Sequence, residues 1–354
     1  MLKEFVCNPV QIPIGSLLKD NLYNEKNILL LNAGTRITDK VHETLLRYGK
    51  PVKILIDVIE DNSIKTRASD ETFSLSKEIK ERTKQGVEYI YNNPNSSDLL
   101  IAADEVSTTL LDVVDNSTDI NISLNNIKVS DEYTFKHCVD VATMGVLIGK
   151  NLLFSDRRLK DIVIAGILHD LGKTKVPDEI LNKPGRLTDD EFKIIQTHPI
   201  YGYDLVSKSN QLSNDAKLAI LEHHEKIDGT GYPRKCKGDE ISLLGRLLSI
   251  VDVYDALVTK RPYRDEIIEP ATAIEMMLSM SNQFDIQLLR AFLNCVVIYP
   301  IGTKLQLSDN KFYTVVEQNE GYPTRPTVED ILTGERFNLC KDPKCLSLVI
   351  VRSC

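Results

Sequence analysis

Histidine and aspartate side chains are concentrated in one part of this chain. Five of its six histidines fall between residues 137 and 224, and most stand beside a carboxylate or another histidine. Where they are not adjacent, the groups are 25 to 32 residues apart, so each group is expected on a different helix. Imidazole and carboxylate without thiolate are the ligands of iron, manganese or zinc in hydrolytic centres. The candidate metal ligands are His137, His169, Asp170, His198, His223, His224 and Asp252.

The number of these donors indicates two metal ions. Seven side chains exceed what one six-coordinate ion can accept while it keeps positions for a substrate. If Asp170 bridges two ions, the seven side chains supply eight ligand bonds, and about four of roughly twelve octahedral positions stay open for water or substrate oxygens. Two ions about 3.5–4 Å apart suit in-line attack on phosphorus. The residues therefore favour phosphoester hydrolysis.

Helices are expected to carry most of these groups. Leu, Ile and Val recur every three or four residues over 72–92 and 98–114, which predicts two helices before the histidine-rich region. Within it, the Thr-Asp-Asp-Glu sequence at 188–191 is a capping-box pattern for a helix through Gln196. His198-Pro199 is typical of the start of the next helix, with proline in its first turn.

The limits of the helical core follow from its turn residues. A buried helix is predicted over 162–171, stopped by Gly172. The all-α core is expected to extend to about Val297, because Tyr-Pro-Ile-Gly at 299–302 is a turn sequence.

Short strands are expected on both sides of this core. Apolar runs at 28–31 and 52–56 predict strands, and 39–48 predicts one helix between them. Alternating residues predict further strands near the C-terminal end, at 304–307, 312–316 and 347–352. The expected fold class is mainly α. The expected domains are a small mixed α/β domain over 1–60, linking helices over 72–116, an all-helical catalytic bundle over 117–298 and a small β extension over 299–354.

Composition excludes several classes of protein. The net charge of −8 argues against a nucleic-acid polymer as partner, and it requires a local basic cluster for any anionic substrate. Apolar runs such as 162–168 are far short of the roughly 20 residues of a membrane span. No signal-peptide pattern is found at the start, so we expect a cytoplasmic protein. The seven scattered cysteines are too sparse for a disulfide scaffold.

Two motifs resemble those of a known family. Residues 169–173, His-Asp-Leu-Gly-Lys, are similar to the HD signature of metal-dependent phosphohydrolases. Residues 223–233, HHEKIDGTGYP, resemble the extended signature of the HD-GYP subfamily, and further similar segments follow in family order over roughly 117–297. The resemblance implies a bacterial signalling hydrolase: a phosphodiesterase that opens cyclic di-GMP to linear pGpG and often continues to GMP.

The resemblance also implies roles for individual residues. The seven candidate ligands would bind two divalent ions, iron or manganese ahead of zinc, nickel or magnesium, with Asp170 as the catalytic bridge. Lys173 would face the scissile phosphate and stabilise its charge. Arg261 and Arg264 would bind a phosphate and supply the local basic cluster. Tyr232, in the Gly-Tyr-Pro loop, would lie against substrate or a signalling protein partner.

Several residues near these motifs have a different expected role. Asp255 shares a helix face with Asp252 and is expected to support a ligand or cap a helix, not to bind metal. His42, outside every motif, is expected in the core or at the surface. Part of the family has Glu four residues before the first ligand histidine, where it helps to hold a third ion. Tyr133 stands there in this chain, and Glu132 lies about 100° round the helix, so two ions are expected.

Two alternatives to this function stay open. A catalytically silent receptor for the dinucleotide is one, although this chain retains all seven candidate ligands. A phosphodiesterase for another cyclic dinucleotide, such as cyclic GMP-AMP, is the other, because base recognition depends on the shape of the pocket. The linking helices could mediate homodimerisation.

Overall fold

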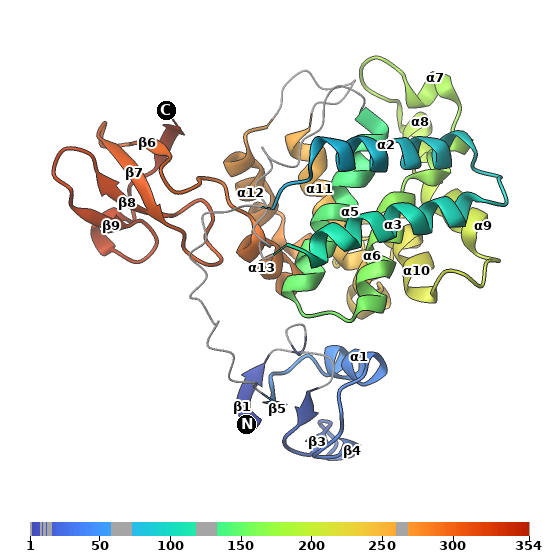
Figure 1. Cartoon of the computed structure of the whole chain (residues 1–354), viewed down its shortest axis with the longest axis horizontal. Coiled ribbons are helices and arrows are strands. Elements are labelled where there is room, and N and C mark those ends of the chain that lie inside the picture. The colour runs from blue at the N-terminus through green and yellow to red at the C-terminus, as the bar shows by residue number, and fades with distance from the viewer. Residues whose placement is uncertain are drawn as a thin grey trace. The chain divides into compact units, whose positions relative to one another are not determined.

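Two compact units make up the chain. The computed structural model describes residues 2–7, 9, 12, 16–57, 73–117, 133–259 and 268–353. One unit combines residues 1–68 with the short segment 148–159, and the other combines 69–147 with 160–354 (Figure 1). The division into four domains stays a prediction.

A small sheet and one helix form the first unit. Strands β1 (Leu2–Cys7), β5 (Val52–Asp57) and β2 (Leu17–Leu18) pair antiparallel in the order β1-β5-β2, and β3 (Leu22–Tyr23) pairs with β4 (Leu29–Leu31). Helix α1 (Asp39–Tyr48) begins after Thr38, whose hydroxyl accepts a hydrogen bond from the Val41 amide. The predicted helix and the predicted strands at 28–31 and 52–56 are confirmed. Strand β1 was missed.

His42 is a core residue of this unit. Its imidazole is fully buried. Nε2 lies 2.6 Å from the Pro9 carbonyl oxygen, and Nδ1 lies 2.6 Å from Nη1 of Arg158, in the first turn of α6 (Asp156–Leu168). Because a guanidinium can only donate and a carbonyl can only accept, this pair of contacts fixes a neutral ring with its proton on Nε2. Burial, with a smaller contribution from the Arg158 charge, lowers the pKa of His42 to about 4.

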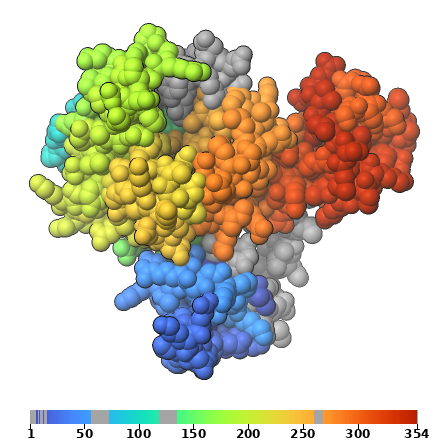
Figure 2. All heavy atoms as spheres, turned by 180° about the vertical axis from the view of Figure 1, so that it is seen from behind, coloured from blue at the N-terminus to red at the C-terminus, as the bar shows by residue number. Residues whose placement is uncertain are grey.

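Helices dominate the second unit. Those before the signature loop are α2 (Lys77–Asn92), α3 (Leu99–Asp115), α5 (Tyr133–Asn151), α6 (Asp156–Leu168), η2 (Leu171–Lys175), α7 (Asp178–Leu181), α8 (Asp189–Ile195), α9 (His198–Val206) and α10 (Asn214–Glu222). Those after it are η3 (Gly238–Glu240), α11 (Leu243–Val258), α12 (Pro270–Ser279), η4 (Ser281–Gln283) and α13 (Ile286–Cys295). The segments coloured yellow to orange form a continuous surface (Figure 2). No described helix is long and apolar enough to cross a membrane.

Local capping sets most of the helix starts. Thr188 and Glu191 form the predicted capping box of α8, and α9 begins at His198 with proline in its first turn. The predicted helix over 162–171 is wrong at its end: α6 stops at Leu168, and Gly172 lies inside the 3-10 turn η2. The helix ends three residues earlier, where the His169 ring donates to the Gly166 carbonyl, 2.7 Å away.

A five-stranded antiparallel sheet follows the helices. Its strands are β6 (Lys304–Leu307), β7 (Phe312–Glu317), β8 (Thr327–Asp330), β9 (Arg336–Asn338) and β10 (Ile350–Ser353), in the order β10-β6-β7-β8-β9. Leu305, Val315 and Val328 are among the residues of its core. The predicted strands at 304–307 and 312–316 are confirmed, the third begins at Ile350 and not at 347, and β8 and β9 were not predicted. The fold class, mainly α with small α/β and β parts at the two ends, is confirmed.

Candidate metal centre

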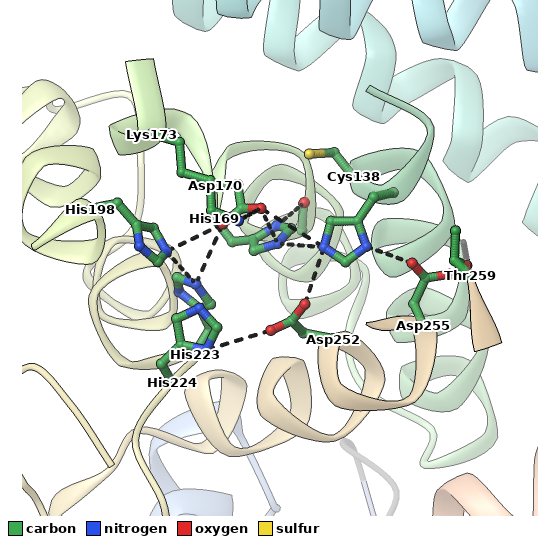
Figure 3. Close-up of polar contacts among 12 residues, drawn as sticks. Cys138, His169, Asp170, Lys173, His198, His223, His224, Asp252, Asp255 and Thr259 are labelled. Carbon is green, nitrogen blue, oxygen red and sulfur yellow. Dashed lines mark hydrogen bonds and ion pairs between the residues drawn. The ribbon is translucent and has the colours of Figure 1, made fainter. Parts of the chain in front are cut away.

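Five separate elements bring the candidate ligands to one place. His137 comes from α5, His169 and Asp170 from the turn between α6 and η2, and His198 from the start of α9. His223 and His224 follow the end of α10, and Asp252 lies on α11. Figure 3 shows their side chains pointing toward one another. All are buried except His224, whose side chain is 23% exposed.

Three of the histidines are held in one orientation by the same backbone contact. The Nδ1 atoms of His169, His198 and His223 lie 2.7, 2.7 and 2.8 Å from the carbonyl oxygen three residues earlier in the chain. A carbonyl can only accept, so Nδ1 carries the proton and Nε2 presents a lone pair to the centre. This is the tautomer that binds a metal through Nε2.

These lone pairs face one another at short range. Nε2 of His198 lies 3.2 Å from Nε2 of His223 and 3.2 Å from Oδ1 of Asp170. Two acceptor nitrogens and a carboxylate oxygen repel one another unless a cation lies between them. Oδ1 of Asp170 is buried and has no hydrogen-bond donor among the described residues. The donor set therefore fits a divalent metal.

The donors fall into two groups that share one residue. His137, His169 and Asp170 form one group, and Asp170, His198, His223 and His224 form the other. Within each group the ligand atoms lie within 4.8 Å of one another. Asp252 lies between the groups, with Oδ1 3.1 Å from Nε2 of His137 and Oδ2 3.6 Å from Nδ1 of His224.

Asp255 stands behind His137. Its Oδ2 lies 2.6 Å from Nδ1 of His137, on the side of the ring away from the other donors, and its Oδ1 accepts from the Thr259 hydroxyl at 3.1 Å (Figure 3). Asp255 thus contacts a candidate ligand as expected, and its supporting role stays a prediction. A carboxylate in this position fixes the ring and raises its basicity.

The charges of the cluster are set by burial and by its own members. Burial by itself raises the pKa of Asp170, but the Lys173 ammonium and the His169 imidazole hold it well below its usual range. Burial lowers the pKa of His223 well below its usual range and that of His224 to about 3. Burial also disfavours protonated His137, but hydrogen bonds to Asp252 and Asp255 raise its pKa to about 9. Ionised carboxylates beside mostly neutral imidazoles attract a cation.

Two glycines allow backbones to meet around the centre. A Cβ at Gly172 would collide with the His198 carbonyl, so η2 and α9 can approach closely enough to bring Asp170 and His198 together. A Cβ at Gly231 would likewise collide with the backbone at His224 and Glu225. The amide of Tyr232 donates to the His224 carbonyl at 3.1 Å, which places the signature loop directly on the second pair of histidines.

Two buried glutamates hold the signature loop in place, and the sequence analysis gave neither a role. Glu225 accepts from the amides of Arg234 and Cys236 at 2.7 and 3.1 Å. Glu222 accepts from the Ser242 amide at 2.7 Å and pairs with the guanidinium of Arg234. Both carboxylates are about 1% exposed, although glutamates are rarely buried without such partners.

The donors open into a cavity of about 570 Å³. Lys173 lines it, and its Nζ lies 2.5 Å from Oδ2 of Asp170, so the structure places this ammonium beside the centre as expected. Tyr232 also lines the cavity, with its ring 4.7 Å from that of His224. Arg261, Arg264 and Glu132 lie outside the described residues, as does the side chain of Tyr133.

A tyrosine of α2 touches the backbone that leads into the centre. The Tyr91 hydroxyl donates to the Ile167 carbonyl at 3.1 Å and lies 3.1 Å from Sγ of Cys138. Ile167 is two residues before His169, and Cys138 follows His137. Helix α2 therefore contacts both segments that carry the first group of donors.

Comparison with known proteins agrees with these features. Residues 125–288 match the HD domain family. The chain is 40% identical over 225 residues to a cyclic di-GMP phosphodiesterase of Pseudomonas aeruginosa, which covers 64% of this chain and 52% of that protein. It is 28% identical over 205 residues to the cyclic di-GMP phosphodiesterase PdeB of Borreliella burgdorferi, covering 58% of this chain and 54% of that protein.

A relative whose name gives a different substrate also matches. The chain is 40% identical over 149 residues to the 3′3′-cGAMP-specific phosphodiesterase 3 of Vibrio cholerae, which covers 42% of this chain and 32% of that protein. The chain thus spans about half the length, or less, of these curated relatives. The matching sequence and the converging donors lie in the same part of the chain, and residues 125–288 are similar to the HD domain family.

Proposed function

We propose that this protein is a metal-dependent phosphodiesterase that hydrolyses cyclic di-GMP with two divalent ions. The observation that carries the proposal is the pair of donor groups joined by Asp170 at the base of a cavity of about 570 Å³. The first ion would be held by His137, His169, Asp170 and Asp252. The second would be held by Asp170, His198, His223 and His224. Iron or manganese suits this set of imidazoles and carboxylates.

Bound ions at such a site supply Lewis acidity toward phosphoryl oxygens and a nucleophile at neutral pH. The residues of the chain perform the remaining tasks. The imidazoles are fixed before binding by the backbone carbonyls, so little reorganisation is needed when the ions enter. Asp170 keeps its negative charge because Lys173 and His169 stabilise it.

Lys173 is the cation of the cavity nearest to the donors. Its side chain is 23% exposed, and its Nζ can reach a phosphate at the centre without leaving the cavity. There an ammonium stabilises negative charge on the phosphoryl group or helps to protonate the leaving oxygen. The Tyr232 ring beside His224 would contact the same substrate. Arg261 and Arg264 would bind a phosphate that is not cleaved.

The choice of substrate rests on the relatives. Several matching proteins, including the two from Pseudomonas aeruginosa and Borreliella burgdorferi, carry the name cyclic di-GMP phosphodiesterase, which supports cyclic di-GMP as the substrate. We propose pGpG and then GMP as the products. A second candidate substrate is 3′3′-cGAMP, because a relative specific for it is equally identical over a shorter segment.

Product analysis tests the function. The chain purified without oxygen is incubated with cyclic di-GMP or 3′3′-cGAMP and Mn²⁺ or Fe²⁺, and linear products are separated by chromatography. We expect pGpG from cyclic di-GMP and none after chelation. Asp170→Asn should abolish turnover while circular dichroism stays unchanged, because the lost charge weakens both sites. Binding of cyclic di-GMP without any linear product would identify a receptor instead, and full turnover by Asp170→Asn would contradict the two-metal proposal.

A further inference from the structure

The cavity has a second wall that the proposed chemistry does not use. Besides the metal donors, the cavity is lined by residues between 180 and 195, from α7, the following turn and α8. This wall offers apolar side chains, Leu187 and Phe192 among them, together with the charged Arg186 and Asp189. An apolar surface with a few polar groups is typical of a wall that contacts the organic part of a ligand.

The turn that carries Arg186 is fixed to α8. Nζ of Lys183 lies 2.7 Å from both carboxylate oxygens of Glu191, and the same carboxylate accepts from the Thr188 amide at 2.7 Å. The charge of Lys183 is thus neutralised by a carboxylate of α8. Arg186 differs: among the described residues its guanidinium has no carboxylate partner, although it lines the cavity.

Phe192 gives this wall a flat aromatic face. Its side chain is 47% exposed and lines the cavity, and its ring meets that of Tyr232 edge to face at 6.4 Å. A half-exposed aromatic ring at a cavity gives a ligand an apolar surface to contact. Nucleobases stack on such rings whatever their identity.

We propose that this wall binds a guanine base of the substrate and selects it over adenine. Phe192 stacks on the base, Arg186 donates to guanine O6 and N7, and Asp189 accepts from N1–H and N2–H. Adenine has an amino group at the position of guanine O6, and its N1 carries no hydrogen. It therefore offers Arg186 a donor in place of the O6 acceptor, and it offers Asp189 no N1–H to accept from. The inference rests on the proposed function and adds the residues that determine its specificity.

Substitution of Arg186 tests the inference in the full-length chain. For Arg186→Ala we expect kcat/KM for cyclic di-GMP to fall about 5- to 150-fold, the range of one bidentate contact to guanine. Arg186→Lys should lose nearly as much, because an ammonium lacks the planar fork. Hydrolysis of bis(4-nitrophenyl) phosphate, which has no base, should stay within about twofold in both variants, because the metal donors are unchanged.

Lys193→Ala is the matched control. Lys193 lies on the same helix, its side chain is 71% exposed, and its removal changes the net charge by the same amount. It should leave both substrates within about twofold of the wild-type rates. Phe192→Ala should weaken cyclic di-GMP and cyclic di-AMP binding by similar factors, measured by calorimetry after chelation, whereas Arg186→Ala should weaken only cyclic di-GMP.

Three results would contradict guanine recognition or the proposed function. Unchanged kcat/KM of Arg186→Ala for cyclic di-GMP, or an equal loss on the base-free substrate, overturns guanine recognition by Arg186. Wild-type hydrolysis of bis(4-nitrophenyl) phosphate without hydrolysis of cyclic di-GMP overturns the proposed function alone, and the binding measurements then decide the role of the wall. If the wild-type chain binds neither dinucleotide, the inference is wrong as well.

Discussion

Replacing Asp255 by asparagine isolates the support that this residue gives to the metal centre. The carboxylate lies 2.6 Å from Nδ1 of His137 and also accepts from the Thr259 hydroxyl. Asparagine keeps the size of the side chain and one oxygen acceptor for His137, and its amide can donate to Thr259. The substitution therefore removes the charge with little change in packing. His137 becomes a weaker donor because its ring loses the negative partner that raises its basicity.

The expected size of the effect follows from this single contact. A hydrogen bond to a charged group contributes about 1.5–3 kcal/mol when its partner is buried. That energy corresponds to about 10- to 150-fold in a binding constant, in agreement with the roughly 10- to 100-fold loss typical of supporting residues at metal sites. Because asparagine keeps an acceptor, we expect about a tenfold loss in Mn²⁺ affinity. Only the ion at His137 and His169 should be affected.

Calorimetric titration of the chelated protein with Mn²⁺ measures this loss directly. Wild-type protein should show two binding steps, and Asp255→Asn should weaken one of them. Asp285→Asn serves as a control, because it alters another partly buried carboxylate, paired with Arg246 at 2.8 Å, outside the donor cluster. Identical Mn²⁺ affinities in wild type and Asp255→Asn would refute the supporting role, as would an equal loss in Asp285→Asn.

Four further outcomes are expected. His42 has a pKa of about 4 in the folded protein, below its usual 6.5. Its contribution to stability is therefore present above pH 6.5 and is lost as the pH falls toward 4. Over this range, urea denaturation should show that the free energy of unfolding falls by up to about 3 kcal/mol more in the wild type than in His42→Gln. Tyr91→Phe removes the hydroxyl contacts to Cys138 and the Ile167 carbonyl, and urea denaturation should show a loss of about 1–2 kcal/mol, whereas an unchanged midpoint would show these contacts to be dispensable. Arg261→Ala should raise KM for cyclic di-GMP more than it lowers kcat, by about 1.5–3 kcal/mol in binding, and an unchanged KM would count against a phosphate contact. Elemental analysis of anaerobically purified protein should find about two ions per chain, and a third would contradict the argument from Tyr133.

Features that depend on neighbouring residues could be predicted from the sequence. The capping box at Thr188 and the proline after His198 are local signals, and both helices begin where expected. The end of α6 was placed wrongly because Gly172 was interpreted as a helix stop. Its actual role is the close approach to the His198 backbone, which no local pattern reveals.

Contacts between distant residues account for most of what was missed at the site. Glu222 and Glu225 lie near the end of a helix, where charged residues are common and usually exposed. Their hydrogen-bond partners lie 9 to 20 residues further along the chain, so no local pattern indicates that these glutamates are buried. Arg186 was given no role from the sequence, because only the cavity distinguishes it from the ion-paired Lys183. Strand β8 has the same length as the predicted strand β6, but its sequence (Thr-Val-Glu-Asp) lacks the polar and apolar alternation of β6 (Lys-Leu-Gln-Leu), and the three residues of β9 (Arg-Phe-Asn) are too few for a period to be visible.

The packing of His42 against the connection between α5 and α6 has a practical consequence for dissecting the protein. Arg158 is 3% exposed, and its guanidinium contacts His42 and lies 3.6 Å from Asp39, while Phe154 meets the His42 ring edge to face. A fragment cut at residues 125 and 288 would retain Arg158 and Phe154 but lose their contacts with His42 and Asp39. The bounds of the segment that matches the HD domain family therefore differ from the bounds of the compact units. Truncations and domain swaps should keep residues 1–57 together with 148–159.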